Sequence, residues 1–243
     1  MGKNHIKRIA APKSWDIKRK TYKFIARPMP GPHSVKSALT LNFLLRNVLE
    51  YAKTTKEIKM ILTNKSILVD KTVRNDYKFP IGLMDVVEIP AMNEYYRMIY
   101  NSKGKLKLLS IDSKESNMKL LKVINKSIVK KGKIQLTFHD GRNILLDKFE
   151  GKVGDTALFD LQKKEIKKWL PLAENALVYL SGGGYVGSLA KIKGIIKARD
   201  LQKGKVLIEI DGKDYITLSD YAFVVGKDKS EIKVQEKWIK WEI

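Results

Sequence analysis

From residue 94 onward the chain is a succession of short apolar segments separated by turn residues, and this pattern limits the fold more than any other feature. Short apolar segments between regular turns are typical of strands in a small barrel or sandwich. Asp-Gly pairs at 140–141 and 211–212 are strong hairpin signals. In the tail, residues 230–243, apolar and polar residues alternate only weakly, so the sequence fits either a strand or a loose tail. The tail contains Trp238 and Trp241. The expected strands are residues 94–101, 105–111, 118–129, 133–140, 142–147, 155–161, 175–180, 188–200, 204–212, 213–218 and 221–226.

Helical periodicity is strongest between residues 37 and 64. Residues 37–52 place apolar side chains on one stripe, which predicts a helix that buries Leu41, Leu44, Leu45, Val48 and Leu49. Thr54 and Glu57 have the spacing of a capping box, which predicts a second helix over 54–64. A strand-turn-strand around 70–71 and a strand over 85–89 should follow, before Pro90 ends the ladder.

Residues 1–36 have neither a helical nor an alternating period and hold four of the seven prolines. Residues 1–40 carry ten basic groups and one acidic group. We expect an irregular basic extension that does not fold alone and is mobile when unbound. Trp15, Tyr22 and Phe24 lie among its cations, and aromatics among cations suit docking on a surface or stacking on bases. The alternative is a solubilising tail.

The whole chain has 48 basic and 26 acidic residues, a net charge of +22. Such an excess repels itself unless a polyanion neutralises it, so nucleic acid or an anionic membrane is the expected partner. No apolar run approaches the roughly 18 residues that span a bilayer, and the first residues have no apolar signal core. We therefore expect a soluble intracellular nucleic-acid binder. Its 40 lysines against 8 arginines favour phosphate contacts over base readout.

Searches for catalytic and cofactor motifs are mostly negative. The chain has no cysteine and three histidines, and His139-Asp140 lies next to a hairpin turn, where we expect a structural histidine. Gly182, Gly184 and Gly187 match GxGxxG, but β-like residues follow where a dinucleotide site needs a helix. We expect no catalytic residues, no metal and no cofactor.

Several segments carry a family resemblance. Residues 180–192 resemble a KOW motif, with an apolar strand, a glycine-rich loop and a second strand. Residues 37–90 resemble the small RNA-binding module of bacterial ribosomal protein S4. In combination the chain resembles the S4e family of small-subunit ribosomal proteins of archaea and eukaryotes, through residues 5–15, 27–33, 43–47, 79–86 and 97–100. It departs from the family pattern in two places. The KOW loop contains three consecutive glycines followed by Tyr185, and the C-terminus is short and has no basic run.

The resemblance implies an α+β, mostly β fold in four parts. These are a basic extension (1–36), an S4-like module (37–93), a central β domain (94–172) and an SH3-like KOW domain with a tail (173–243). It also implies a structural protein that binds small-subunit rRNA in the cytoplasmic ribosome, beside other small-subunit proteins and without a membrane or a second copy. The expected rRNA-binding residues are Lys3, Lys7, Arg8, Lys13, Trp15, Lys18, Arg19, Lys20, Arg27, Arg46, Lys53, Lys56, Lys71 and Arg74, with a KOW loop of Gly182, Gly183, Gly184 and Gly187.

Two other functions remain open. An RNA-modifying enzyme can use an S4-like module as an anchor, but it needs a catalytic domain, and residues 95–243 offer no recognisable acid–base or cofactor group. A KOW-type translation or transcription factor would bind transiently and would not need such a basic extension. Retention on ribosomal subunits in high salt separates a structural component from a factor.

Overall fold

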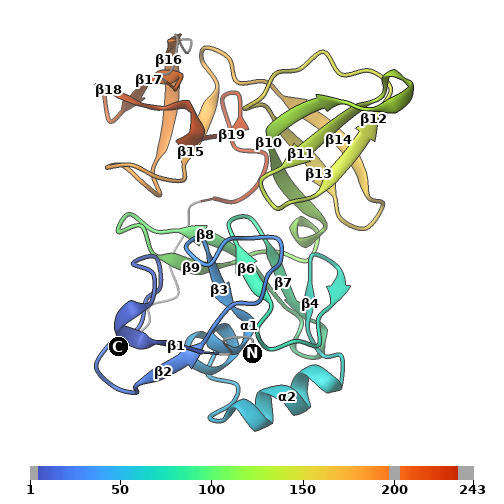
Figure 1. Ribbon diagram of the computed structural model, residues 1–243. Coiled ribbons are helices and arrows are strands. Elements are labelled where there is room, and N and C mark those ends of the chain that lie inside the picture. Colours follow the sequence, from blue (N-terminus) through green and yellow to red (C-terminus); the bar gives the residue numbers. More distant parts are fainter. Residues whose placement is uncertain (1–4, 197–202, 235–243) are drawn as a thin grey trace. The chain divides into compact units, whose positions relative to one another are not determined.

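The computed structural model describes residues 5–196 and 203–234. These residues form two compact units. Unit 1 holds residues 5–99 and 105–117, and unit 2 holds residues 100–104, 118–196 and 203–234. Antiparallel strands dominate both units, which confirms the mostly β class predicted from the sequence (Figure 1). Within the described ranges, no helix is both long enough and apolar enough to cross a membrane.

Unit 1 is built around a five-stranded sheet of order β5-β4-β7-β8-β9. Two strand pairs, β1-β2 and β3-β6, complete its described strands. Asp70 and Lys71, at φ 51° and 60°, form the turn between β4 and β5, as predicted. The strands are β1 (His5–Lys7), β2 (Phe24–Ala26), β3 (Ala38–Thr40), β4 (Leu68–Val69), β5 (Thr72–Val73), β6 (Pro80–Gly82), β7 (Val86–Ile89), β8 (Glu94–Tyr100) and β9 (Leu106–Ser110).

The first predicted helix is shorter than the sequence indicates. Residues 38–40 form β3 and pair with β6, so the helical segment begins only after Thr40, whose side-chain oxygen accepts the N–H of Phe43. The segment consists of α1 (Leu41–Phe43) and a π-helical continuation, η2 (Leu44–Val48). Strand pairing therefore overrides helical periodicity at 37–40. In the predicted stripe, Leu41, Leu44 and Leu45 are buried, whereas Val48 and Leu49 are half-buried.

The second helix, α2 (Thr55–Thr63), matches its prediction. Thr54 is its N-cap, and the capping box with Glu57 is present. Ile58 and Leu62 form its buried face. Short 3₁₀ turns occur in both units, at η1 (Arg8–Ala10), η3 (Pro90–Met92), η4 (Glu115–Asn117), η5 (Lys130–Gly132) and η6 (Ser219–Tyr221).

Strands β8 and β9 belong to the sheet of unit 1 and not to the sheets that follow. Strand β8 pairs with β7 from Val86↔Arg97 to Ile89↔Glu94. The predicted central β domain starts at residue 94, so the observed pairing of β8 with β7 differs from that boundary. The reason is local, because a three-residue turn, η3, reverses the chain and returns it beside the strand it has just left. The four-part functional division itself stays a prediction.

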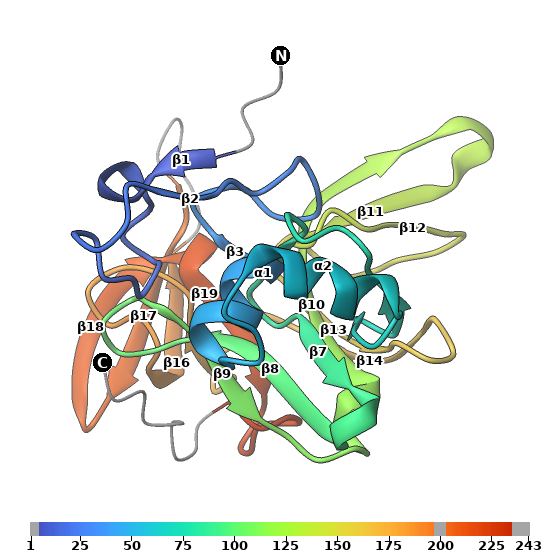
Figure 2. The ribbon, with the colours of Figure 1, turned by 90° about the horizontal axis from the view of Figure 1, so that it is seen from below.

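Unit 2 consists of two five-stranded antiparallel sheets, of order β12-β11-β10-β13-β14 and β18-β17-β16-β15-β19. Strand β10 pairs with β13 through its first residues and with β11 through its last, with an irregularity between Val123 and Asn125. Beyond that point β10 and β11 project as an arm (Figure 2). The strands are β10 (Met118–Ile128), β11 (Ile134–Phe138), β12 (Asn143–Leu146), β13 (Thr156–Asp160), β14 (Glu165–Leu170), β15 (Leu177–Leu180), β16 (Leu189–Ile196), β17 (Lys205–Ile210), β18 (Lys213–Leu218) and β19 (Ala222–Gly226).

Both predicted Asp-Gly hairpins are present in unit 2. The turn at 140–141 joins β11 to β12, and the turn at 211–212 joins β17 to β18 with φ values of 49° and 77°. Strand β14 is missing from the prediction because its charged residues hide its period, yet it pairs with β13. In the tail, Gly226 and Ser230 form an isolated bridge. Trp238 and Trp241 lie outside the described residues, as does the end of the strand predicted over 188–200.

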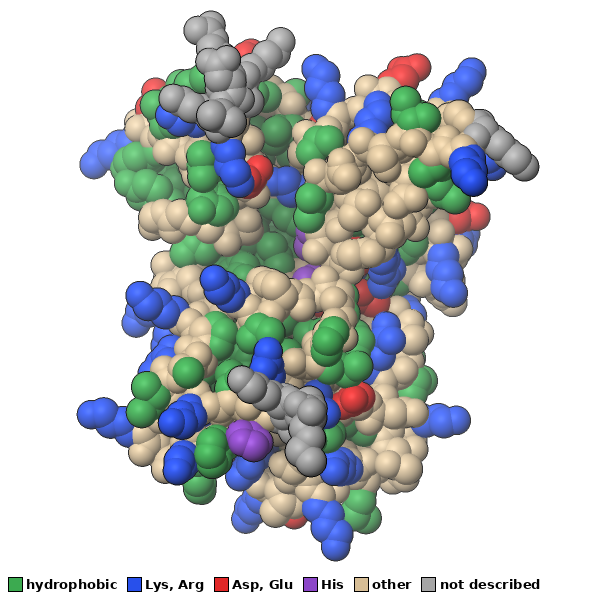
Figure 3. Space-filling view, in the orientation of Figure 1, with side chains coloured by type: hydrophobic (Ala, Val, Ile, Leu, Met, Phe, Trp, Pro, Cys, Tyr) green, Lys and Arg blue, Asp and Glu red, His purple; other side chains and the backbone are tan. Residues whose placement is uncertain are grey.

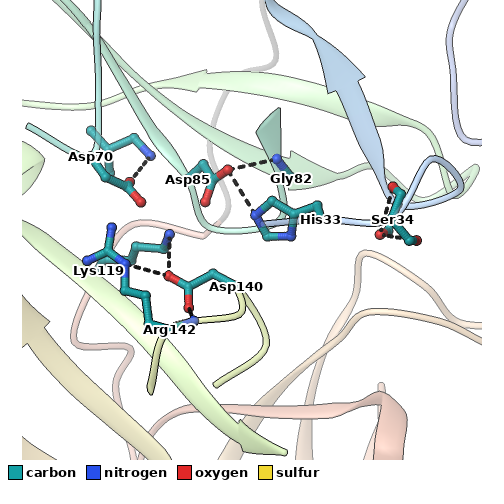
Figure 4. A network of polar contacts seen from close by, with 10 residues as sticks. His33, Ser34, Asp70, Gly82, Asp85, Lys119, Asp140 and Arg142 are labelled. Carbon is teal, nitrogen blue, oxygen red and sulfur yellow. Dashed lines mark hydrogen bonds and ion pairs between the residues drawn. The ribbon is translucent and has the colours of Figure 1, made fainter. Parts of the chain in front are cut away.

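Two lysines of unit 2 are buried and fully engaged. Lys119 Nζ lies 3.1 Å from Asp140 Oδ2, and Arg142 approaches the same carboxylate at 3.0 Å (Figure 4). Although burial opposes ionisation, the charges of Lys119, His139 and Arg142 hold the pKa of Asp140 below its usual value. Lys122 Nζ donates to the carbonyls of Ser219, Asp220 and Ala222 at 3.0, 2.9 and 2.6 Å, which ties β10 to the segment before β19.

Candidate nucleic-acid interface

The N-terminal extension is folded as part of unit 1, in contrast to the irregular segment expected from its sequence. Strands β1 and β2 pair with Ile6 opposite Ile25, so the apolar pair faces inward while His5, Lys7 and Phe24 share the other face. This hairpin brings together two cation-rich segments that lie about twenty residues apart. The prediction that the extension is mobile when unbound is a statement about the isolated protein and stays untested.

Two arginines of the extension act mainly as braces for its loop. Arg8 is buried, and its Nη1 donates to the carbonyl of Lys18 at 2.9 Å and to Thr21 Oγ1 at 2.8 Å. Arg19 donates to the carbonyls of Ile9 and Ala11 at 3.0 and 2.9 Å. A guanidinium with five donors suits this role because it can satisfy several loop carbonyls at once.

Trp15, an expected RNA-stacking residue, is a core residue instead. It is 1% exposed, and its ring lies 5.9 Å from that of Phe43. The flanking Ser14 carbonyl accepts the N–H of Leu106, and Asp16 forms ion pairs with Lys105 and Lys107. Burial of a large apolar ring stabilises the fold and removes it from any partner. We therefore withdraw Trp15 from the interface.

The exposed aromatics of the extension are Tyr22 and Phe24, at 65% and 45% exposure. The ring of Tyr22 lies 5.4 Å from the guanidinium carbon of Arg8 and 5.9 Å from that of Arg46. Phe24 has the Lys23 ammonium 5.5 Å from its centroid and packs edge-on against His5. We call His5, Arg8, Tyr22, Lys23, Phe24 and Arg46 the aromatic–cation patch. The expected rRNA-binding residues include Trp15 but neither Tyr22 nor Phe24, because interleaving with cations does not reveal which ring is buried.

The charges within this patch are unbalanced. Burial lowers the pKa of Arg8, and the nearby positive charge of Arg46 lowers it further. Among the described residues, neither Arg8 nor Arg46 has an acidic partner, whereas many other cations in the same ranges form ion pairs. Two guanidinium groups beside an exposed ring repel each other until an anion lies between them. The arrangement suits a phosphate with an adjacent base on the ring.

The first turn of helix α2 is capped by the side chains of Thr54 and Glu57. Lys53 and Lys56, two of the expected rRNA-binding residues, are exposed. However, the Glu57 carboxylate accepts the backbone N–H of Lys53 at 2.9 Å and the Thr54 hydroxyl at 2.8 Å. These bonds, led by that from Thr54, lower the pKa of Glu57. A phosphate at this helix start would meet a negative carboxylate, so the two lysines alone remain as candidate contacts.

Two expected cations of the module are used within unit 1. Lys71 Nζ lies 2.8 Å from Glu88 and donates to Ser116 Oγ at 3.1 Å. The guanidinium of Arg74 lies 4.3 Å from the ring centroid of Phe79. Both groups stabilise the fold where they are, so they are weaker candidates for RNA contact than the exposed lysines.

The other expected RNA contacts fall into three groups. Most are exposed cations, and Lys and Arg side chains project around the visible outline of both units in Figure 3. Arg27 and Arg46 are half-buried, and Lys3 lies outside the described residues. The exposed members are Lys7, Lys13, Lys18, Lys20, Lys53 and Lys56.

The glycine loop of unit 2 combines a packing role with an open surface. At Gly187, φ is 81°, and a Cβ would lie 2.5 Å from the backbone of Asn101, so the chain requires glycine there. A Cβ on Gly182 would lie 2.7 Å from the ring of Tyr221, whereas Gly184 has open space around it. Gly183, at φ 87°, turns the loop. These glycines precede strand β16 and not a helix, so the loop lacks the helix N-terminus of a dinucleotide site.

Beside the glycine loop, Tyr185 is 42% exposed and its ring lies 4.2 Å from that of Tyr215. His139 packs edge-on against Phe223 at 5.2 Å, which supports the structural role expected for it. In residues 5–196 and 203–234, no group of three metal-binding side chains comes together.

Comparisons with known proteins agree across nearly the whole chain. Residues 1–36 match the RS4NT (NUC023) domain, and residues 92–166 match the model described as Ribosomal family S4e. The chain is 39% identical to small ribosomal subunit protein eS4 of Methanothermobacter thermautotrophicus, over 96% of both chains. It is 40% identical to the eS4 protein of Methanocaldococcus jannaschii, over 96% of this chain and 98% of that one.

A solved structure is also similar. The crystal structure of 30S ribosomal protein S4e from Thermoplasma acidophilum matches with a TM-score of 0.69 and 30% sequence identity. The match covers 82% of this chain and 99% of that chain. The structural comparison and the sequence comparisons therefore match the chain to the same group of proteins.

Proposed function

The chain belongs to the S4e family of ribosomal proteins, and from this premise we propose that its aromatic–cation patch is a main rRNA contact. The protein is a structural constituent of the small ribosomal subunit that binds rRNA and supports translation. Its place is the ribosome, in the cytoplasm. The observation that carries the proposal is the exposed Tyr22 ring beside two guanidinium groups that have no acidic partner among the described residues.

The binding mechanism is electrostatic. Cations that neutralise phosphates release the counterions condensed on RNA, and this release drives binding with little sequence readout. In the patch, a phosphate on Arg46 relieves the repulsion that the charge of Arg46 exerts on the buried Arg8. An unpaired base on Tyr22 adds stacking, which is worth about 1–3 kcal/mol per base.

The exposed lysines of the extension and of α2 extend this surface as point charges. Lysine suits contacts to phosphate that do not require fixed geometry. Neighbouring small-subunit proteins complete the environment of the chain. We also propose that the protein acts without a second copy, without a membrane and without catalysis of its own.

Salt dependence tests the electrostatic account. If about six phosphates are contacted, the log–log slope of rRNA affinity against salt should lie near −4 to −5. Purified protein and small-subunit rRNA can be titrated from low to high salt by filter binding. A flat salt response would contradict the proposal, and release from assembled subunits in high salt would indicate a transient factor.

A further inference from the structure

Unit 1 contains a second candidate contact that the aromatic–cation patch does not include. Residues 27–35, together with Lys78, line an open cavity of about 620 Å³. This volume falls within the ~300–1,000 Å³ typical of small-ligand sites. The loop runs from β2 towards β3 and carries Pro28, Pro30 and Pro32.

The walls of this cavity are fixed by buried contacts. His33 Nε2 lies 2.9 Å from Asp85 Oδ2, and both side chains are almost fully buried (Figure 4). The same carboxylate oxygen also accepts the N–H of Gly82, at 2.8 Å. A Cβ on Gly82 would lie 2.4 Å from the His33 ring, so glycine at 82 is what lets the imidazole occupy its position.

Two further contacts hold the loop itself. The N–H of Met29 donates to the carbonyl of Lys78 at 3.0 Å. A Cβ on Gly31 would lie 2.8 Å from Pro80 Cγ, so the loop passes closely over β6. With three prolines restricting φ, the loop loses little conformational entropy when a ligand binds.

The chemistry of the lining suits one class of ligand. Its charged groups are the cations Arg27 and Lys78, and none of its lining residues is acidic. Among the described residues, Arg27 has no ion pair or side-chain hydrogen bond. The three prolines have no N–H but each keeps a carbonyl acceptor. Met29 and Val35 add apolar surface.

A nucleotide presents the complementary groups. Its phosphate pairs with a guanidinium, its exocyclic amine donates to a carbonyl, and its base covers apolar surface. A carboxylate of an acidic protein segment also pairs with a guanidinium, but a nucleotide adds a planar base that covers apolar surface, so the lining favours RNA.

We propose that the cavity of residues 27–35 and Lys78 binds one unpaired nucleotide of small-subunit rRNA, with its phosphate on Arg27 and its base over Met29 and Val35. This inference rests on the proposed function and adds to it a defined subsite, separate from the aromatic–cation patch. The subsite binds a nucleotide that is already flipped out or looped, because a base within a helix cannot enter a cavity.

A site-directed crosslink tests the identity of the occupant. The chain has no cysteine, so Ser34→Cys introduces a unique thiol on the cavity lining. The thiol is labelled with a benzophenone maleimide, the protein is assembled into small subunits, and the subunits are irradiated. Met92→Cys, at an exposed residue outside the lining, is the matched control.

We expect the label carried by the Ser34→Cys variant to crosslink to a short rRNA stretch that differs from any stretch reached from the control. A crosslink mainly to a ribosomal protein, or no crosslink, overturns the proposal. Salt-dependent rRNA binding by the unmodified chain would still support the proposed function in that case, so the two failures can be distinguished.

Reversing the charge of Arg27 is a second, independent test of the subsite. Arg27→Glu should weaken rRNA affinity about tenfold, as expected for loss of a charge-assisted phosphate contact. Lys36→Glu makes the same change of charge at an exposed neighbour outside the lining, and it should weaken affinity about threefold or less. Equal losses from the two variants would overturn the subsite, and matching melting temperatures would exclude misfolding.

Discussion

The aromatic–cation patch of unit 1 and the buried lysines of unit 2 differ in what surrounds their positive charges. In unit 2, Lys119 is fully buried against Asp140, and Lys122 donates to three carbonyls. In unit 1, Arg8 and Arg46 approach one exposed tyrosine with no acidic partner among the described residues. Net charge alone therefore does not locate an RNA interface. We propose that cations that the fold itself leaves unneutralised indicate it better.

Among the substitutions that distinguish the two regions, Lys119→Ala should lower the melting temperature most. Removing the ammonium takes away the buried ion-pair partner of the Asp140 carboxylate, and breaking a buried pair costs about 3–5 kcal/mol. We expect the melting temperature to fall by about 10 °C, with rRNA affinity of the folded protein unchanged.

The control for this prediction is Lys205→Ala, at an exposed lysine of β17. Exposed substitutions usually change stability by less than about 0.5 kcal/mol. A similar melting temperature for the two variants would contradict a structural role for Lys119.

A smaller effect should appear as a pH dependence of unit 2. Burial lowers the pKa of Lys122 to about 8 from its ordinary 10.5, although the charge of Asp220 opposes this. The unfolded chain therefore binds more protons between these two values, so the free energy of unfolding should rise with pH from about 8 to 10.5. The rise is at most about 3 kcal/mol, because the three carbonyl contacts favour the charged form.

Denaturant titrations across this pH range measure the effect. Lys122→Met has nothing to titrate at this position, so its unfolding free energy should lack the rise attributed to Lys122. Parallel curves for Lys122→Met and the unmodified protein would show that burial of Lys122 does not shift its pKa.

Arg46→Ala should have the smallest effect on stability. It should leave the melting temperature equal or slightly higher while weakening rRNA binding. Loss of its charge relieves the repulsion of Arg8, so the melting temperature should stay equal or rise slightly. Loss of one phosphate contact should reduce the salt slope of rRNA binding by about 1. A lower melting temperature with an unchanged slope would assign Arg46 to the fold.

The strands and turns were largely predictable from the sequence, because Asp-Gly turns and apolar segments act locally. The capping box at Thr54 and Glu57 was predictable for the same reason. The helix start at Thr40 was not, since the pairing of β3 with β6 joins residues about forty positions apart.

The site was only partly predictable. Its general place, a basic extension with interleaved aromatics, follows from composition. Which aromatics remain exposed does not, because burial of Trp15 against Phe43 depends on tertiary packing. Nor does the sequence show that Lys71 pairs with Glu88 while Arg46 keeps no acidic partner in the described part of the chain.

The most direct test of the account is retention on small subunits in high salt for two matched double variants. One variant combines Tyr22→Ala with Arg46→Ala in the patch. The other combines Ile216→Ala with Lys213→Ala on unit 2, which removes the same charge and a side chain of similar exposure, 63% against 65% for Tyr22. We predict that the patch variant washes off at a salt concentration that retains both the control and the unmodified protein. Equal retention of the two double variants would contradict the claim that unneutralised cations beside an exposed ring form the rRNA contact.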